Sequence, residues 1–470
     1  MDRTGTGARI GLVGLGTMGA ALALNIAEKG FTVAVWNRTT RVTRDFAAGA
    51  GPLAPRIIPT ESLADLVAAI RPPRAIILMV PAGDPVDQQI AALQPLLSPD
   101  DMIIDAGNAN FHDTERRMKA GLGLRFLGIG VSGGEEGARH GPSIMGGGAR
   151  ADWDSVAEVM KAIAARAEDG SPCAAWMGEG GAGHFVKSVH NGIEYADMQM
   201  IAEVYGIMRD GLGMGAAAIG DIFARWDAGV LRSFLIEISA TVARTNDPAT
   251  GQPILDVITD AAGQKGTGRW TAIEAQHLAA PVPVIEAAVM ARNVSARRSE
   301  RAAGEARFGP APQPVAITVD DLEQALIAGK ILCYAQGFAM IRSAGAAFGW
   351  TLDLPGIARV WRAGCIIRSD MLGDMARALD EDGARNLILA PFFAERIEAA
   401  LPALRRVVAG GIAGGHALPA LGAGLAWFDL MRTARGTANM IQGQRDFFGW
   451  HGFDRLDGRD IHHGPWAVPG

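Results

Sequence analysis

The sequence predicts an α/β amino-terminal part built on a doubly wound parallel sheet, then a large all-α part and an extended tail. Short β-branched runs alternate with helical stretches in residues 1–180. The periodicity is helical in 181–444, and it is lost after Phe448 in the tail, 445–470. Alternation of strand and helix implies parallel strands, because each crossover helix returns the chain in the same direction. A chain of 470 residues is long enough for two or three domains, which we expect at these three ranges.

The amino-terminal elements follow from local apolar patterns bounded by Gly and Pro. Strands are predicted at Ile10–Val13, Phe31–Trp36, Ala75–Val80, Met102–Asp105, Arg125–Ile129 and Ala174–Met177. Helices are predicted at Met18–Lys29, Glu61–Ile70, Pro85–Leu97, Asp113–Ala120 and Asp152–Ala167.

A GxGxxG run, GLGTMG, directly follows the first predicted strand and opens a helix. The first glycine permits the tight turn, the second lets the backbone approach a pyrophosphate, and the third lets the helix pack on the sheet. This context predicts a Rossmann-like dinucleotide site, although a glycine turn without a ligand remains the alternative. The expected cofactor residues of this run are Gly14, Leu15, Gly16, Thr17, Met18 and Gly19.

The second predicted strand ends in WNRTT, where an NAD-selective site would carry Asp or Glu. Asn37, Arg38 and Thr39 stand there instead. A guanidinium with amide and hydroxyl donors can neutralise and hold a 2'-phosphate, so NADP is favoured over NAD. The alternative is that Arg38 is only an exposed loop residue.

Two later loops follow strands whose carboxyl ends form the ligand edge of an open sheet. Asn108 lies in IIDAGNAN, and Ser132, Gly133 and Gly134 lie in GVSGGEEGARHGPSIMGGG. Backbone N–H groups, a hydroxyl and an amide can bind a carboxylate or a hydroxyl-rich substrate. For either loop taken alone, Asn and Ser side chains that only stabilise a turn are an equally good explanation.

The stretch GHFVKSVHNGIEYADMQ sorts polar and apolar side chains onto opposite sides of one predicted helix. Lys187, His190, Asn191 and Glu194 share a stripe at helical spacing, with apolar residues opposite. The set indicates a catalytic face, and the alternative is an ordinary solvated face.

A Gly-rich segment, DAAGQKGTGRWT, and a later helix carry further candidates for a phosphate site. Lys265 and Thr267 lie on glycine backbone, but the strand and spacing of a P-loop are missing. Arg292 could bind phosphate in a bidentate way, although a single helical Arg is more often surface charge. The segment alone leaves both interpretations open.

Composition restricts the partners. A net charge of -6 without basic clusters gives no support for binding nucleic acid or a membrane surface. Three dispersed cysteines fit a reducing compartment and make no disulfide framework or Cys-based zinc site. We expect no signal peptide, no apolar run of about 18 residues and no bound metal, hence a cytoplasmic protein. The aromatic tail is expected to pack on its own globule or on a partner subunit.

Together these strings resemble the decarboxylating 6-phosphogluconate dehydrogenase family nearly end to end. The most specific are VSGGEEGARHGPSIM, GHFVKSVHNGIEYADMQ, QKGTGRWT, GCIIRSD and ANMIQGQRDFFGWH. The resemblance implies NADP-dependent oxidative decarboxylation of 6-phosphogluconate to ribulose 5-phosphate in the pentose phosphate pathway. It also implies a homodimer in which each tail reaches the partner's substrate site.

The same resemblance assigns roles residue by residue. Lys187 becomes the general base and Glu194 the general acid, and no metal is required. The implied substrate residues are Asn108, Ser132, Gly133, Gly134, His190, Asn191, Tyr195, Lys265, Thr267 and Arg292, with Arg445 and His451 from the partner's tail. The implied cofactor residues, besides the Gly loop, are Asn37, Arg38, Thr39, Val80, Pro81, Ala82 and Asn108.

Two other functions compete with this interpretation. A shorter dehydrogenase of the 3-hydroxyisobutyrate type shares the Gly loop, the SGG loop and the Lys and Asn of the long helix, but lacks the last 200 or so residues. A catalytically silent NADP-binding protein would be favoured by loss of Lys187 or Glu194, and both residues are present.

Overall fold

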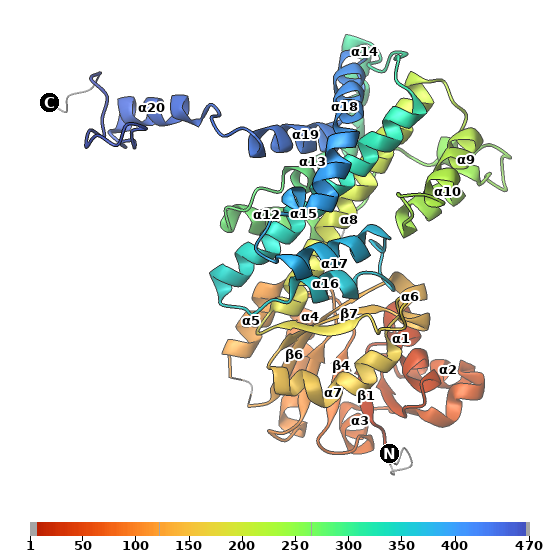
Figure 1. The fold of residues 1–470 in the computed structure, drawn as a ribbon. Helices are drawn as coiled ribbons and strands as arrows, with labels where there is room; N and C mark the ends of the chain where they lie inside the picture. Colours follow the sequence, from red (N-terminus) through yellow and green to blue (C-terminus); the bar gives the residue numbers. More distant parts are fainter. Residues whose placement is uncertain (1–6, 122, 265, 467–470) are drawn as a thin grey trace.

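The computed structural model describes residues 7–121, 123–264 and 266–466. Its amino-terminal part is an eight-stranded sheet in the order β3-β2-β1-β4-β5-β6-β7-β8, at the bottom of Figure 1. All neighbouring strands pair in parallel except β6 and β7, which are antiparallel. The strands are β1 (Ile10–Val13), β2 (Val33–Trp36), β3 (Ile57–Pro59), β4 (Ala75–Leu78), β5 (Met102–Asp105), β6 (Arg125–Ser132), β7 (Ser143–Gly148) and β8 (Ala174–Gly178).

Helices cover both faces of this sheet, and each face has its own apolar core. The strand order reverses direction between β1 and β4, which makes the sheet doubly wound, as predicted. The helices are α1 (Thr17–Glu28), α2 (Thr40–Gly49), α3 (Leu63–Ala69), α4 (Asp84–Leu93), α5 (Phe111–Lys119), α6 (Gly134–His140) and α7 (Arg150–Ile163).

The sequence analysis missed α2, β3, α6 and β7. The segment SIMGGG, which the sequence analysis assigns to a loop, forms the six residues of strand β7. Its glycines serve packing rather than turning: a Cβ on Gly146 would overlap the indole of Trp153, and one on Gly147 would overlap the backbone of Gly183. The strand is therefore glycine-rich because helices lie directly on it.

The carboxyl-terminal part is helical, as predicted, and lies above the sheet in Figure 1. Two long helices, α8 (Ala182–Gly206) and α15 (Val319–Phe348), pack on each other within one large apolar core. The others are α9 (Ala216–Asp227), α10 (Phe234–Arg244), α11 (Ile254–Val257), α12 (Thr267–His277), α13 (Pro283–Ser295), α14 (Arg298–Phe308), α16 (Leu354–Val360), α17 (Met371–Glu381), α18 (Pro391–Ala413), α19 (Pro419–Met431) and α20 (Ala438–Gly449).

Helix α15 is long and apolar enough to cross a membrane by length and composition, so the expectation of no such run was wrong. However, 89% of its apolar window is buried inside the protein. Its apolar character is that of a core helix surrounded by other helices.

The chain ends in an arm. Helix α20 and the residues after it lie well away from the rest of the molecule, at the left of Figure 1. The arm exposes large apolar side chains, among them Met440, Phe447 and Phe448. Helical structure stops at Gly449, one residue beyond the predicted loss of period.

A buried ion pair joins the two long helices. The ammonium of Lys330 on α15 lies 2.6 and 2.7 Å from the carboxylate oxygens of Asp197 on α8. Both residues are almost fully buried, and the hydroxyl of Ser233 lies 3.5 Å from the same ammonium. Because both groups are shielded from water, removing one of them leaves the other buried without a partner.

Asp197→Asn should therefore lower the free energy of unfolding by about 3–5 kcal/mol, because it leaves an ammonium buried without a counter-charge. Denaturant unfolding followed by circular dichroism measures this loss. The double variant Asp197→Leu with Lys330→Met should recover most of it. A loss below about 1 kcal/mol in the single variant would mean that the pair is not buried as described.

Candidate active site

The Gly loop between β1 and α1 has the geometry of a pyrophosphate site. Gly14 has a φ of 98°, and a Cβ there would lie 2.5 Å from the carbonyl oxygen of Met79. A Cβ on Gly19 would overlap the carbonyl oxygen of Gly14, whereas Gly16 faces open space. Three glycines are thus needed for three different reasons, as the motif predicts. Gly16 and Thr17 are exposed at the amino terminus of α1, Met18 is partly exposed and Leu15 is buried.

The side chain of Asn37, at the end of β2, holds this loop in place. Its Oδ1 accepts a hydrogen bond from the backbone N–H of Leu15 at 3.1 Å. The backbone N–H of Asn37 donates to the hydroxyl of Thr43. Thr43 is buried, and the sequence analysis missed it. Arg38 and Thr39 are exposed at the start of α2, next to the Gly loop.

The segment Val80, Pro81 and Ala82 follows β4, the strand beside β1. A Cβ on Gly14 would meet the side chain of Val80 at 3.1 Å, so this segment borders the Gly loop. Pro81 is exposed. The predicted cofactor residues therefore gather at the carboxyl ends of β1, β2 and β4.

A buried ion pair shapes the Asn108 loop. Asp105, the last residue of β5, accepts hydrogen bonds from the N–H of Gly107 at 3.1 Å and from Arg117 at 3.0 Å. Both charged residues are almost fully buried. Sequence analysis did not single them out, although an Asp closing an apolar strand was a signal. The loop presents an exposed Asn108, whose Oδ1 accepts from the Nδ2 of Asn191 at 3.3 Å.

The predicted polar stripe on α8 is assembled in the structure. Lys187 donates from Nζ to the Oδ1 of Asn191, and its Nζ lies 3.4 Å from the Nδ1 of His190. The Nε2 of His190 lies 3.2 Å from the hydroxyl of Ser132, at the end of β6. A carboxylate oxygen of Glu194 lies 3.9 Å from the Nδ1 of His190. The stripe, the Asn108 loop and the Ser132 loop thus form one site.

This stripe is buried rather than solvated. Lys187, His190 and Asn191 are buried, and only Glu194 is partly exposed. The stripe lies against β6 at Gly130, where a Cβ would overlap the side-chain carbons of Lys187. After Ser132, Gly133 has a φ of 115° and Gly134 a φ of 63°, which turn the chain into α6 beside the stripe.

Burial changes the acidity of these groups. It lowers the pKa of Lys187, and the carboxylate of Glu194 opposes this lowering only in part. Burial and then the Lys187 charge lower the pKa of His190 well below its usual value, so the imidazole is neutral. Burial raises the pKa of Glu194, against the opposing charges of Lys187 and Arg292. A lysine that deprotonates more easily and a carboxyl that holds its proton longer are suited to be base and acid.

The predicted phosphate residues lie beside the polar stripe of α8, near Glu194. The guanidinium of Arg292 lies 3.5 Å from the ring centre of Tyr195, and its Nη1 donates to the carbonyl oxygen of Gly263 at 3.1 Å. Thr267 begins α12, directly after the left-handed Gly266. Lys265 lies outside the described residues. The Gly-rich segment, Tyr195 and Arg292 are therefore neighbours.

Helix α12 is fixed to α8 by Thr271, which the sequence analysis did not identify. Its hydroxyl donates to the carbonyl oxygen of Ser188 at 2.6 Å. Arg445 and His451 lie on the arm, far from α8 of the same chain (Figure 1). A single chain does not bring these two residues to the site.

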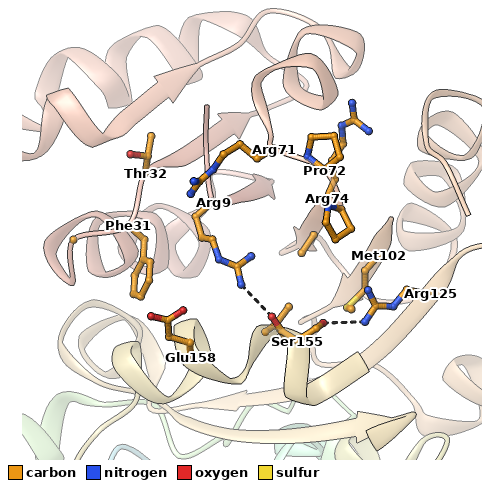
Figure 2. A pocket seen from close by; sticks show the side chains of 14 residues that line it. Arg9, Phe31, Thr32, Arg71, Pro72, Arg74, Met102, Arg125, Ser155 and Glu158 are labelled. Carbon is orange, nitrogen blue, oxygen red and sulfur yellow. Dashed lines mark hydrogen bonds between the residues drawn. The ribbon is translucent and has the colours of Figure 1, made fainter. Parts of the chain in front are cut away.

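A separate cavity of about 370 Å³ lies at the opposite, amino-terminal edge of the sheet (Figure 2). Arg9 donates to the carbonyl oxygen of Ser155 at 3.0 Å, and Arg125 donates to its hydroxyl at 2.9 Å. Arg125 and Arg74 are further paired with Asp152 and Asp101. These hydrogen bonds and ion pairs join α7 and the strand ends, and the ligand edge lies at the other end of the strands.

Comparison with known proteins gives two matching family models. "NAD binding domain of 6-phosphogluconate dehydrogenase" matches residues 9–178, and "6-phosphogluconate dehydrogenase, C-terminal domain" matches residues 183–466. The chain is 45% identical over 482 residues to the decarboxylating 6-phosphogluconate dehydrogenase of Treponema pallidum, covering 99% of this chain and 98% of that protein.

Two further relatives differ in cofactor. The NAD(+)-dependent decarboxylating enzyme of Bacillus subtilis is 43% identical, with 97% of this chain and 99% of that protein covered. The solved 6-phosphogluconate dehydrogenase of Plasmodium falciparum, described in its apo form and with NADP+ and with 6-phosphogluconate, is 37% identical with a TM-score of 0.93. That match covers 97% of this chain and 100% of the other.

Proposed function

The chain belongs to the 6-phosphogluconate dehydrogenase family, and on this premise we propose that it oxidises and decarboxylates 6-phosphogluconate with NADP. The products are ribulose 5-phosphate, CO2 and NADPH. The observation that carries the proposal is a buried lysine of lowered pKa, set between His190 and Asn191 and followed by a carboxyl of raised pKa on the same stripe.

Lys187 acts as the general base. Burial lowers its pKa by disfavouring the ammonium, and in its neutral form the amine takes the proton of the substrate 3-hydroxyl. NADP, bound along the Gly loop, supplies the acceptor for the hydride that leaves C3. Lys187 then returns its proton to the new 3-keto oxygen as the C1–C2 bond breaks and CO2 leaves. The β-keto group takes up the electron pair of that bond, so the step requires no metal.

Glu194 acts as the general acid. Its raised pKa lets it hold a proton longer, and it donates this proton to the carbon that was C2 of the substrate and is C1 of the enediol, while Lys187 takes the enol proton back. Asn191 orients the Lys187 amine, and Ser132 orients the neutral His190. Asn108, Ser132, Gly133, Gly134, His190 and Asn191 hold the substrate's carboxylate and hydroxyls.

The substrate phosphate binds at Tyr195, Lys265, Thr267 and Arg292. Contacts to a phosphate remote from the reacting carbons hold C3 against the nicotinamide and so contribute to rate as well as to affinity. This phosphate site is supported by the close packing of Arg292 on Tyr195, next to the start of α12. Arg445 and His451 complete the site from the partner subunit of a homodimer.

The three parts of the chain divide this work. Residues 1–180 bind the cofactor, 181–444 carry the catalytic helix and the dimer contacts, and the tail from 445 closes the partner's site. The three cysteines are free and buried, which fits action in the cytoplasm.

Lys187→Met should abolish NADPH formation with 6-phosphogluconate while leaving NADP affinity within about twofold, because only the base is removed. Near-ultraviolet absorbance with CO2 detection measures turnover, and fluorescence titration measures binding. Lys161→Met, exposed on α7, is the matched control. Normal turnover by the Lys187 variant would exclude the base role, and activity only on 3-hydroxyisobutyrate would exclude the substrate.

The pH profile of kcat/KM in the native protein should fall as pH drops through the lowered pKa of Lys187, because the protonated amine cannot accept the substrate proton. This acidic limb should lie below the usual value of 10.5 for lysine. A limb at or above that value would contradict a buried, neutral base.

Arg38→Ala should raise the KM for NADP about tenfold and leave the KM for NAD nearly unchanged, because only NADP carries the 2'-phosphate. The matched variant Asn37→Ala loosens the Gly loop and should weaken the binding of NAD as well as that of NADP. Steady-state kinetics with each cofactor separates the two effects. Equal losses with NADP and NAD in the Arg38 variant would contradict the 2'-phosphate contact.

Deletion of residues 443–470 should abolish turnover and weaken dimerisation, because the partner's site loses Arg445 and His451 and the exposed apolar arm is removed. Analytical ultracentrifugation and activity assays check both. An active, monomeric truncated protein would refute a shared site.

A further inference from the structure

Three metal-ligating side chains outside the site come together where the sheet part meets the helical part. His112 is the second residue of α5, and Glu274 and His277 lie one turn apart on α12. The Nε2 of His112 lies 2.8 Å from Oε2 of Glu274, and the Nδ1 of His277 lies 3.3 Å from the same oxygen. One donor atom from each residue lies within 4.8 Å of the other two.

The two separations from the Glu274 carboxylate are close to those between ligands of a small transition-metal ion. Zinc binds imidazole nitrogen and carboxylate oxygen at about 2.0–2.2 Å, so two ligands of a tetrahedral site lie about 3.3 Å apart. Two imidazoles and one carboxylate favour zinc-like ions over calcium or magnesium, which prefer oxygen ligands. Three protein ligands leave the fourth position for water.

The three side chains can be reached by an ion from solvent, because only the carboxylate is buried. The side chain of Glu274 is only 7% exposed, whereas those of His112 and His277 are 54% and 64% exposed. A cavity of about 250 Å³ lies beside the three residues and is also lined by Asn110, Ser188 and Trp270. The carboxylate is therefore held in the wall of an open cavity, with the imidazoles at its mouth.

Both supports of the cluster are rigid. The ring of His112 lies 4.0 Å, centre to centre, from that of Phe111, which packs edge-on against Phe185 of α8 at 5.2 Å. Helix α12 is fixed to α8 by the hydrogen bond from Thr271 to Ser188. The ligands need little ordering when an ion binds.

We propose that His112, Glu274 and His277 bind one divalent transition-metal ion of the zinc class. The ion joins α5, which follows the Asn108 loop, to α12, which begins at the predicted phosphate segment. It takes no part in the proposed reaction, and its site exists only in the folded chain. Binding therefore stabilises the folded protein.

Isothermal titration of the chelator-treated, full-length protein with zinc chloride tests the site. His112→Asn and His277→Asn should each lower the affinity for one zinc ion at least about tenfold. Loss of a residue that only supports a metal ligand already lowers affinity by that factor. The control is His140→Asn: His140 faces Glu136 one turn away at 3.6 Å, and among the described residues no third ligand joins this His–Glu pair. It should leave zinc affinity unchanged. Equal zinc affinity in the native protein and both cluster variants overturns the proposal.

Cobalt(II) reports the geometry independently of affinity. The native protein and His140→Asn should show the intense visible bands of four-coordinate cobalt, and both cluster variants should lose them. Zinc should raise the melting temperature of the native protein and not of the variants, with all proteins alike in chelator. A rise shared by the cluster variants, or no cobalt bands in the native protein, would show that the cluster is an ion pair only.

Discussion

The close approach of α8 to the sheet is the constraint on which the site depends. A Cβ on Gly183, at the start of this helix, would lie 2.5 Å from the carbonyl oxygens of Gly128 and Met145. Gly130 allows the same approach further along, against Lys187. Only glycine-lined strands admit a helix at this distance. The contact places the polar stripe of α8 beside Ser132 and Asn108, and it excludes water from the amine.

Burial of the site is the largest cause of the pKa shifts of Lys187 and Glu194. Lys187 and Glu194 lie on one stripe and could neutralise each other, yet burial shifts both toward their uncharged forms. Further along the same helix lies a buried ion pair in direct contact, Asp197 with Lys330. One helix thus carries a buried ion pair that anchors it to α15 and, nearer its start, a lysine and a carboxyl whose pKa values burial shifts toward the uncharged forms.

Toward its carboxyl end α8 carries another buried carboxyl, Glu203. It accepts backbone N–H groups of Ala420 and Leu421, the first turn of α19, at 2.7 and 2.9 Å. Burial raises its pKa to about 7 in spite of these donors. The helix that carries the polar stripe therefore also positions the helix that leads into the arm. This connection links the site of one chain to the segment proposed to complete the site of its partner.

The sequence alone determined the fold class, the Gly loop and the polar stripe, because helical and strand periods and GxGxxG spacing are local properties. It missed β7, whose glycines permit helix packing rather than a turn. It also missed Thr43 and Asp105, which accept hydrogen bonds from nearby backbone N–H groups, and Arg117 and Thr271, whose partners Asp87 and Ser188 lie 30 and 83 residues away. Tertiary structure alone decided that the stripe is buried, because burial depends on what the fold places against each residue. The same holds for His112, which meets Glu274 only after the sheet and the helices pack together.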